Sequence, residues 1–124
     1  MPMTRSADAQ SFDLHNARFT SLVRPSLGSR ELCTWRVEVA PGTEGVPHTI
    51  HREEVFVLLQ GSAVITIDGE HSTLSPGDAA VALAGSAIGL SNPTDHPATV
   101  LVTTSVGFTG ELADGTIVNP PWVN

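Results

Sequence analysis

The sequence contains no lysine and no tyrosine, and it has one cysteine among its 124 residues. Without lysine the chain can form no Schiff base and has no lysine base, and without tyrosine it has no phenolic proton donor. One cysteine excludes a disulfide within the chain and a multi-cysteine metal site. Acid–base chemistry must therefore use the five histidines, the carboxylates or Cys33, which we expect to be a buried, reduced thiol.

Basic side chains are also scarce, with six arginines against thirteen acidic residues and a formal net charge of −7. Because nucleic acids and anionic membrane surfaces bind clustered basic residues, and these arginines are scattered singly, we expect neither as a partner. The apolar run from Val55 to Leu59 is far too short to cross a bilayer, and the first ten residues contain no apolar signal core. The sequence therefore predicts a cytoplasmic protein.

Aromatic residues are few: four phenylalanines and two tryptophans in a chain that is 40% hydrophobic. The core must then consist mainly of Val, Leu, Ile and Ala, which favours β structure. The length fits a single domain over residues 1–124, enough to bury roughly two thirds of the unfolded surface. Residues 1–10 are polar, and we expect them to form a mobile arm.

Short apolar segments recur at roughly ten-residue intervals, separated by Gly, Pro, Asn and Asp. The segment from Glu31 to Val39 alternates apolar and polar residues, which is typical of a half-buried strand. Asp68-Gly69 separates two further segments and is the strongest hairpin signal in the chain. Together these patterns predict an antiparallel all-β sandwich or barrel.

Possible chemistry concentrates between Val46 and Gly61, VPHTIHREEVFVLLQG, where histidines and an acidic pair precede an apolar strand and a glycine turn. This stretch resembles the first motif of the cupin family, in which a glycine, two histidines one residue apart, a glutamate and a closing glycine follow at fixed spacing. Glu54 and Gly61 have the required six residues between them, and His48 occupies the first histidine position. Ile50 occupies the second.

A second set of spacings resembles the second cupin motif. Gly77, Leu83, Gly85, Ile88 and Asn92 follow one another at the intervals of that motif, with leucine in place of its proline and isoleucine in place of its histidine. Fifteen residues separate the two motifs. The resemblance implies a single antiparallel jelly-roll β-barrel.

The resemblance also implies where a metal would bind. Family members that bind a metal use the two histidines and the glutamate of the first motif and the histidine of the second, and these places hold His48, Ile50, Glu54 and Ile88 here. A transition metal generally needs three or more protein ligands, so we expect no metal cofactor. His51 could complete a fallback set of His48, His51 and Glu54, but residues three apart on a strand face opposite sides, so a bulge would be required.

His48 and Glu54 are the candidate catalytic residues. Glu54 in an isoleucine-lined cavity should have a raised pKa unless His48 or Arg52 pairs with it. A His–Glu pair in a dry pocket suits proton transfer, and it is equally what a lost metal site would leave behind. The residues predicted to line this pocket are Ile50, Arg52, Phe56, Ile88 and Trp35.

Three functions remain open: a metal-independent isomerase, cyclase or lyase, a non-catalytic module that binds a small molecule, and a metal-dependent oxygenase that recruits His51. The apolar replacements favour the first two, and a small-molecule ligand is the expected partner. Pro120-Pro121 stiffens the C-terminal tail, and Trp122 should pack this tail on the barrel or on a second subunit. The resemblance implies a homodimer.

Overall fold

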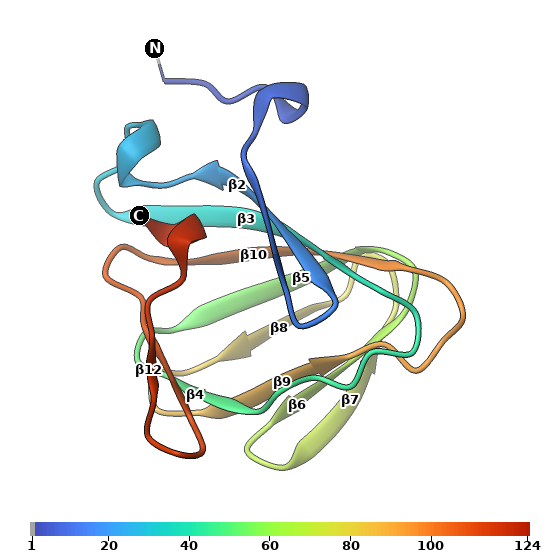
Figure 1. The fold of residues 1–124 in the computed structure, drawn as a ribbon. Coiled ribbons are helices and arrows are strands. Elements are labelled where there is room, and N and C mark those ends of the chain that lie inside the picture. Colours follow the sequence, from blue (N-terminus) through green and yellow to red (C-terminus); the bar gives the residue numbers. More distant parts are fainter. Residues whose placement is uncertain (1) are drawn as a thin grey trace.

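The computed structural model describes residues 2–124, so Met1 of the predicted arm lies outside the described residues. The described chain forms two six-stranded antiparallel sheets that pack face to face as a jelly-roll barrel (Figure 1). In order across the first sheet, the strands are β1 (Ser11–Leu14), β2 (Ala17–Val23), β3 (Leu32–Val39), β10 (Ala98–Ser105), β5 (Glu54–Gln60) and β8 (Ala79–Ala82). The second sheet comprises β12 (Ile117–Val118), β11 (Gly110–Leu112), β4 (His48–Ile50), β9 (Ala87–Ser91), β6 (Ala63–Ile67) and β7 (Glu70–Leu74).

Alternating side chains of the central strands form the core between the sheets. Along β3, Cys33, Trp35, Val37 and Val39 are buried, and the residues between them are more exposed, as the sequence pattern predicts. The neighbouring strand β10 alternates in the same way, from Ala98 onward. Because β10 pairs with both β3 and β5, the inward side chains of three strands form one continuous apolar surface.

The predicted hairpin at Asp68-Gly69 is confirmed. It joins β6 to β7 through a two-residue turn in which φ is 51° at Asp68 and 83° at Gly69. Positive φ at both central positions gives a turn whose twist matches that of the strands, and Asp-Gly adopts it readily. The turn fixes the register in which Ile67 faces Glu70.

The C-terminal tail crosses from the second sheet to the first. After β12 the chain rises to a 3-10 turn, Pro121–Val123, beside β2 and β3, drawn in red in Figure 1. Trp122 stacks on Phe19 of β2, with ring centroids 3.8 Å apart and an interplanar angle of 7°. The Cys33 thiol donates a hydrogen bond to the Val123 carbonyl (3.3 Å), and Ser21 donates to the Trp122 carbonyl (3.0 Å). The tail therefore docks on the barrel of its own chain.

The N-terminal segment contains a short 3-10 turn, Ser6–Asp8, and reaches the barrel at Gln10. The Gln10 carbonyl accepts a hydrogen bond from the Ser21 amide (3.0 Å), and its side-chain oxygen accepts one from Arg24 (2.8 Å). The mobility of residues 1–10 stays a prediction. Within residues 2–124, no helix has the length and apolarity needed to span a bilayer.

Candidate functional site

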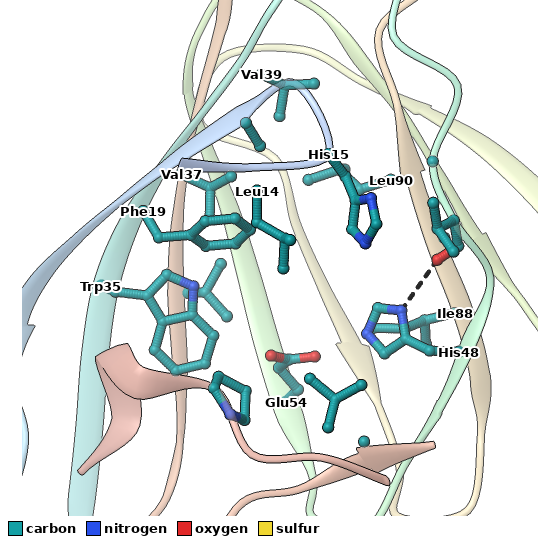
Figure 2. Close-up of a pocket in the computed structure, with 18 of the residues that line it drawn as sticks. Leu14, His15, Phe19, Trp35, Val37, Val39, His48, Glu54, Ile88 and Leu90 are labelled. Carbon is teal, nitrogen blue, oxygen red and sulfur yellow. Dashed lines mark hydrogen bonds between the residues drawn. The ribbon is translucent and has the colours of Figure 1, made fainter. Parts of the chain in front are cut away.

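A cavity of about 170 Å³ lies between the sheets, lined by side chains from both of them (Figure 2). Its walls are mainly apolar, and they gather most of the few aromatic residues of the chain. Five of the six aromatic side chains in the sequence line it: Phe19, Trp35, Phe56, Phe108 and Trp122. The mainly apolar wall makes the interior of the cavity a low-dielectric environment, in which isolated charges are unfavourable.

Glu54 places a carboxyl group in this cavity. It is the first residue of β5, only 3% of its surface is exposed, and Figure 2 shows its carboxyl group between Trp35 and His48. Among residues 2–124, no hydrogen-bond partner lies within reach of its Oε1 atom. Desolvation by burial raises the pKa of Glu54 to about 8. At neutral pH the side chain is therefore a protonated carboxylic acid, able to donate a hydrogen bond or a proton.

His48 begins β4 in the opposite sheet and reaches the cavity from the other side (Figure 2). Its Nδ1 lies 3.1 Å from the Val46 carbonyl oxygen. Because a carbonyl can only accept, Nδ1 carries the proton, and in the neutral ring Nε2 keeps a free lone pair. The ring packs against Gly110 of β11, where an added Cβ would stand 3.3 Å from the His48 Cδ2 atom. A potential base, the imidazole of His48, therefore faces a potential acid, the carboxyl group of Glu54, across the cavity.

The cupin domain family model matches residues 35–104, which is more than half of the chain and includes both strands that carry this pair. The chain belongs to the cupin family. Among solved structures, the polyketide cyclase RemF from Streptomyces resistomycificus is similar to it with a TM-score of 0.78 and 18% identity, over 96% of this chain and 84% of that chain. An RmlC-like cupin from Shewanella frigidimarina has a TM-score of 0.71 and 19% identity, over 85% and 94% of the two chains.

KdgF from Halomonas sp. is a third similar structure, with a TM-score of 0.70 and 19% identity, covering 82% of this cupin and 91% of that chain. A search of the curated proteins finds no match to the sequence. At these identities the likeness shows the shared fold alone. The fold is one that small-molecule enzymes and binders share, so the chemistry must be argued from the residues of this cupin.

The side chains of this cupin do not fit the metal site of its family. The positions of two of the four ligands hold Ile50 and Ile88, which offer no donor atom. Ile88 of β9 pairs with His48 of β4 and lines the cavity beside it. Its aliphatic side chain therefore occupies the position of the second-motif histidine ligand. Within the described chain, no three His, Cys, Asp or Glu side chains converge on a point that could hold a metal ion.

The fallback ligand His51 points away from the cavity. Strand β4 ends at Ile50, and the side chain of His51 is exposed. Its Nδ1 lies 2.6 Å from the Thr109 hydroxyl oxygen, and its Nε2 lies 4.0 Å from a carboxylate oxygen of Glu111. His51 therefore does not join His48 and Glu54.

The predicted pocket lining needs two corrections. Trp35, Phe56 and Ile88 lie in the cavity wall. Ile50 is fully buried in the closed core outside that wall, and Arg52 is exposed at the surface. Arg52 does not follow the strand alternation because residues 51–53 belong to neither β4 nor β5. The bend at residues 51–52 turns its side chain to solvent, and Glu54 and Phe56 face inward again on β5.

Sequence reasoning missed His15, which lies at the mouth of the cavity. It occupies the tip of the β1–β2 hairpin with Asn16, and φ is 51° and 61° at these two residues. Figure 2 shows its ring pointing into the cavity opposite His48, with Leu14 beside it. A His-Asn pair between two strand-like segments signals a two-residue turn. The position of this hairpin over the pocket depends on tertiary packing, which the local sequence pattern does not predict.

Proposed function

We propose that this cupin binds a small, largely apolar organic molecule and catalyses proton transfer on it, as an isomerase or cyclase. One observation carries the proposal: the buried carboxyl group of Glu54, whose Oε1 has no hydrogen-bond partner among residues 2–124, faces His48 across a mainly apolar cavity (Figure 2). Burial, which raises the pKa of Glu54 to about 8, keeps this group protonated at neutral pH. An acid and a base of this kind, held apart in a low-dielectric site, are the two groups that enolisation of a ketone requires.

In the proposed reaction the Glu54 carboxyl donates its proton to the carbonyl oxygen of the substrate. The Nε2 atom of His48 removes a proton from the carbon next to that carbonyl, and the C–H electron pair forms the C=C bond of an enol. Returning a proton to a different carbon gives an isomer, and attack of the enol carbon on a second carbonyl of the same molecule closes a ring. The His48 imidazolium supplies the proton for the new C–H bond of the isomer or, in ring closure, for the alkoxide oxygen formed from the second carbonyl. The enol O–H proton returns to Glu54 as the first C=O bond re-forms, so each cycle leaves the enzyme unchanged.

The proposed reaction requires no metal or redox cofactor. Proton transfer and ring closure change no oxidation state, and the neutral Glu54 acid supplies the polarisation of the carbonyl that a metal would otherwise provide. The name of one structural neighbour, a polyketide cyclase, describes a reaction of this class in a barrel of the same shape. Elemental analysis of protein purified without chelator checks this point, because a stoichiometric transition metal that survives dialysis would contradict it.

Deuterium exchange tests the proposed function without knowledge of the natural substrate. The bicyclic aryl ketone α-tetralone has enolisable C–H bonds at C2, and NMR in D2O measures their exchange. We expect the protein to accelerate this exchange, and His48→Ala and Glu54→Gln each to reduce the acceleration by about 100-fold or more. His51→Ala is the matched control, since His51 is exposed and points elsewhere. Absence of acceleration by the wild type would leave a non-catalytic binding module as the function.

We also propose that the protein is a homodimer. The first sheet ends at the edge strand β8, and large apolar side chains are exposed on it and next to it. Val81 of β8 is 53% exposed, Leu83 just after β8 is 63% exposed, and Leu59 of the neighbouring strand β5 is 48% exposed. An edge strand flanked by exposed apolar side chains favours pairing with a second copy. Light scattering after size exclusion should give twice the mass of the chain, and Val81→Glu should halve it. A monomeric wild type would contradict this proposal.

A further inference from the structure

The cavity has an unusual balance of charge. The chain contains no lysine, and within residues 2–124 none of its arginines lines the cavity. The titratable side chains in the wall are His15, His48 and Glu54. A buried carboxylate or phosphate on a ligand would therefore have no permanent cation to pair with and would face the Glu54 carboxyl. Burying an unpaired charge costs several kcal/mol or more, so the site disfavours anions.

The aromatic walls favour a flat molecule. Trp35 meets Phe108 at an interplanar angle of 58° and Trp122 at 57°, with ring centroids 6.1 and 6.4 Å apart. Trp122 in turn lies flat on Phe19. Aromatic faces and edges set at such angles offer both stacking and edge contacts to a conjugated ligand. Five of the six aromatic residues of an aromatic-poor chain surround this one space, although the rest of the core is built almost entirely from aliphatic side chains.

Polar atoms in the cavity wall that lack hydrogen-bond partners indicate which polar groups the ligand should have. Three such atoms belong to residues that line the cavity: the indole nitrogens of Trp35 and Trp122 and the Oε1 atom of Glu54 are buried and have no hydrogen-bond partner among the described residues. Figure 2 shows the Trp35 nitrogen on the cavity side of its ring and the Glu54 carboxyl group beneath it. Leaving such groups unsatisfied costs about 1–3 kcal/mol each. A ligand oxygen that accepts from them would remove this cost.

We propose that the cavity selects an uncharged, flat, conjugated molecule whose carbonyl oxygens accept hydrogen bonds from the Trp35 indole N–H and the Glu54 carboxyl group. A cavity of about 150 Å³ holds benzene. The volume of about 170 Å³ here therefore encloses one ring or a compact bicycle, and a longer molecule extends past Leu14 and His15 at the mouth. The inference rests on the proposed function in taking this cavity as the substrate site.

Equilibrium binding of three probes to the full chain tests the ligand class. The probes are α-tetralone, its oxygen-free analogue tetralin and the anion 1-naphthoate, measured by calorimetry at pH 7. Quenching of tryptophan fluorescence gives a second readout, because both tryptophans of this tyrosine-free chain line the cavity. We expect α-tetralone to bind about 30-fold more tightly than tetralin, from two hydrogen bonds of about 1 kcal/mol each, and about 100-fold more tightly than 1-naphthoate.

Trp35→Phe tests the hydrogen-bond assignment. It keeps an aromatic ring in the wall and removes the N–H, so the preference for α-tetralone over tetralin should fall about fivefold. The tetralin value also shows that the variant is folded. Equal affinities of the wild type for α-tetralone and tetralin, tight binding of 1-naphthoate, or no binding of α-tetralone would overturn the inference.

The two proposals fail separately. Selective binding of α-tetralone without deuterium exchange at C2 would overturn the proposed catalysis and support the ligand class. The reverse outcome is that Trp35→Phe binds α-tetralone as tightly as the wild type and exchanges deuterium at the full rate. That result would overturn the role of the indole N–H in ligand selection, and it would still support proton transfer by His48 and Glu54.

Discussion

The raised pKa of Glu54 predicts that stability depends on pH in an unusual direction. The carboxyl has a pKa of about 8 in the folded chain, where desolvation disfavours the charged form, against an ordinary value of 4.5. Between these values the folded state binds one proton more than the unfolded state, so the free energy of unfolding falls as pH rises. At about 1.4 kcal/mol per pH unit, the loss across the whole window is about 5 kcal/mol. That is a large fraction of the stability of a single domain.

Glu54→Gln removes this titration and keeps the shape of the side chain. We expect the variant to match the wild type within about 1 kcal/mol at pH 5 and to exceed it by about 4 kcal/mol at pH 8. Urea denaturation at both pH values measures the difference. Glu53→Gln is the matched control, because Glu53 is the adjacent carboxyl and is exposed, so its effect should stay within about 0.5 kcal/mol at both pH values. A Glu54→Gln difference that stays constant between pH 5 and pH 8 would refute the argument.

Three further predictions concern activity and packing. Proton transfer to α-tetralone should decline above pH about 8 as Glu54 loses its proton, and this alkaline decline should be absent from the residual rate of Glu54→Gln. Gly110→Ala should lower the exchange rate about tenfold by displacing the His48 ring, and Gly89→Ala, whose added methyl meets no atom within 4 Å, should not. Trp122→Ala should cost about 3–5 kcal/mol of stability in urea denaturation, because it removes a buried, stacked aromatic side chain.

The sequence was sufficient to predict the architecture, and it placed His48, Glu54 and Ile88 where the structure has them, in the wall of one cavity. The period-two pattern predicts a β-sandwich or barrel, because inward and outward side chains must alternate wherever a sheet covers a core. The resemblance of two spacing patterns to the cupin motifs implies the jelly roll. The same spacings bring His48, Glu54 and Ile88 together, since β4 pairs with β9 and β5 lies in the facing sheet. Regular strands keep the alternation of inward and outward side chains, so the face on which each of these residues lies can be predicted from the sequence.

The features of the site that could not be predicted lie in irregular segments or depend on contacts between segments far apart in the sequence. The bend at residues 51–52 decides that His51 and Arg52 face solvent, and a strand pattern carries no information about how a bend turns. His15 reaches the mouth because a hairpin some thirty residues from His48 in the sequence folds over the pocket. Trp122 arrives from the C-terminus by packing on Phe19. Each is a tertiary contact, and periodicity says nothing of which distant segments meet.

Glu54 is the residue at which the sequence departs furthest from what folding alone requires. Most of the pocket wall is apolar, whereas Glu54 buries a carboxyl group whose Oε1 has no hydrogen-bond partner among residues 2–124, and its burial lowers stability as pH rises toward 8. An aliphatic or amide side chain at this position would fold at lower cost. A buried side chain that destabilises the fold and has no compensating contact is expected at a functional site, where strain or desolvation contributes to the reaction. The cost of Glu54 is therefore an argument for its role as an acid, independent of its place in the family motif.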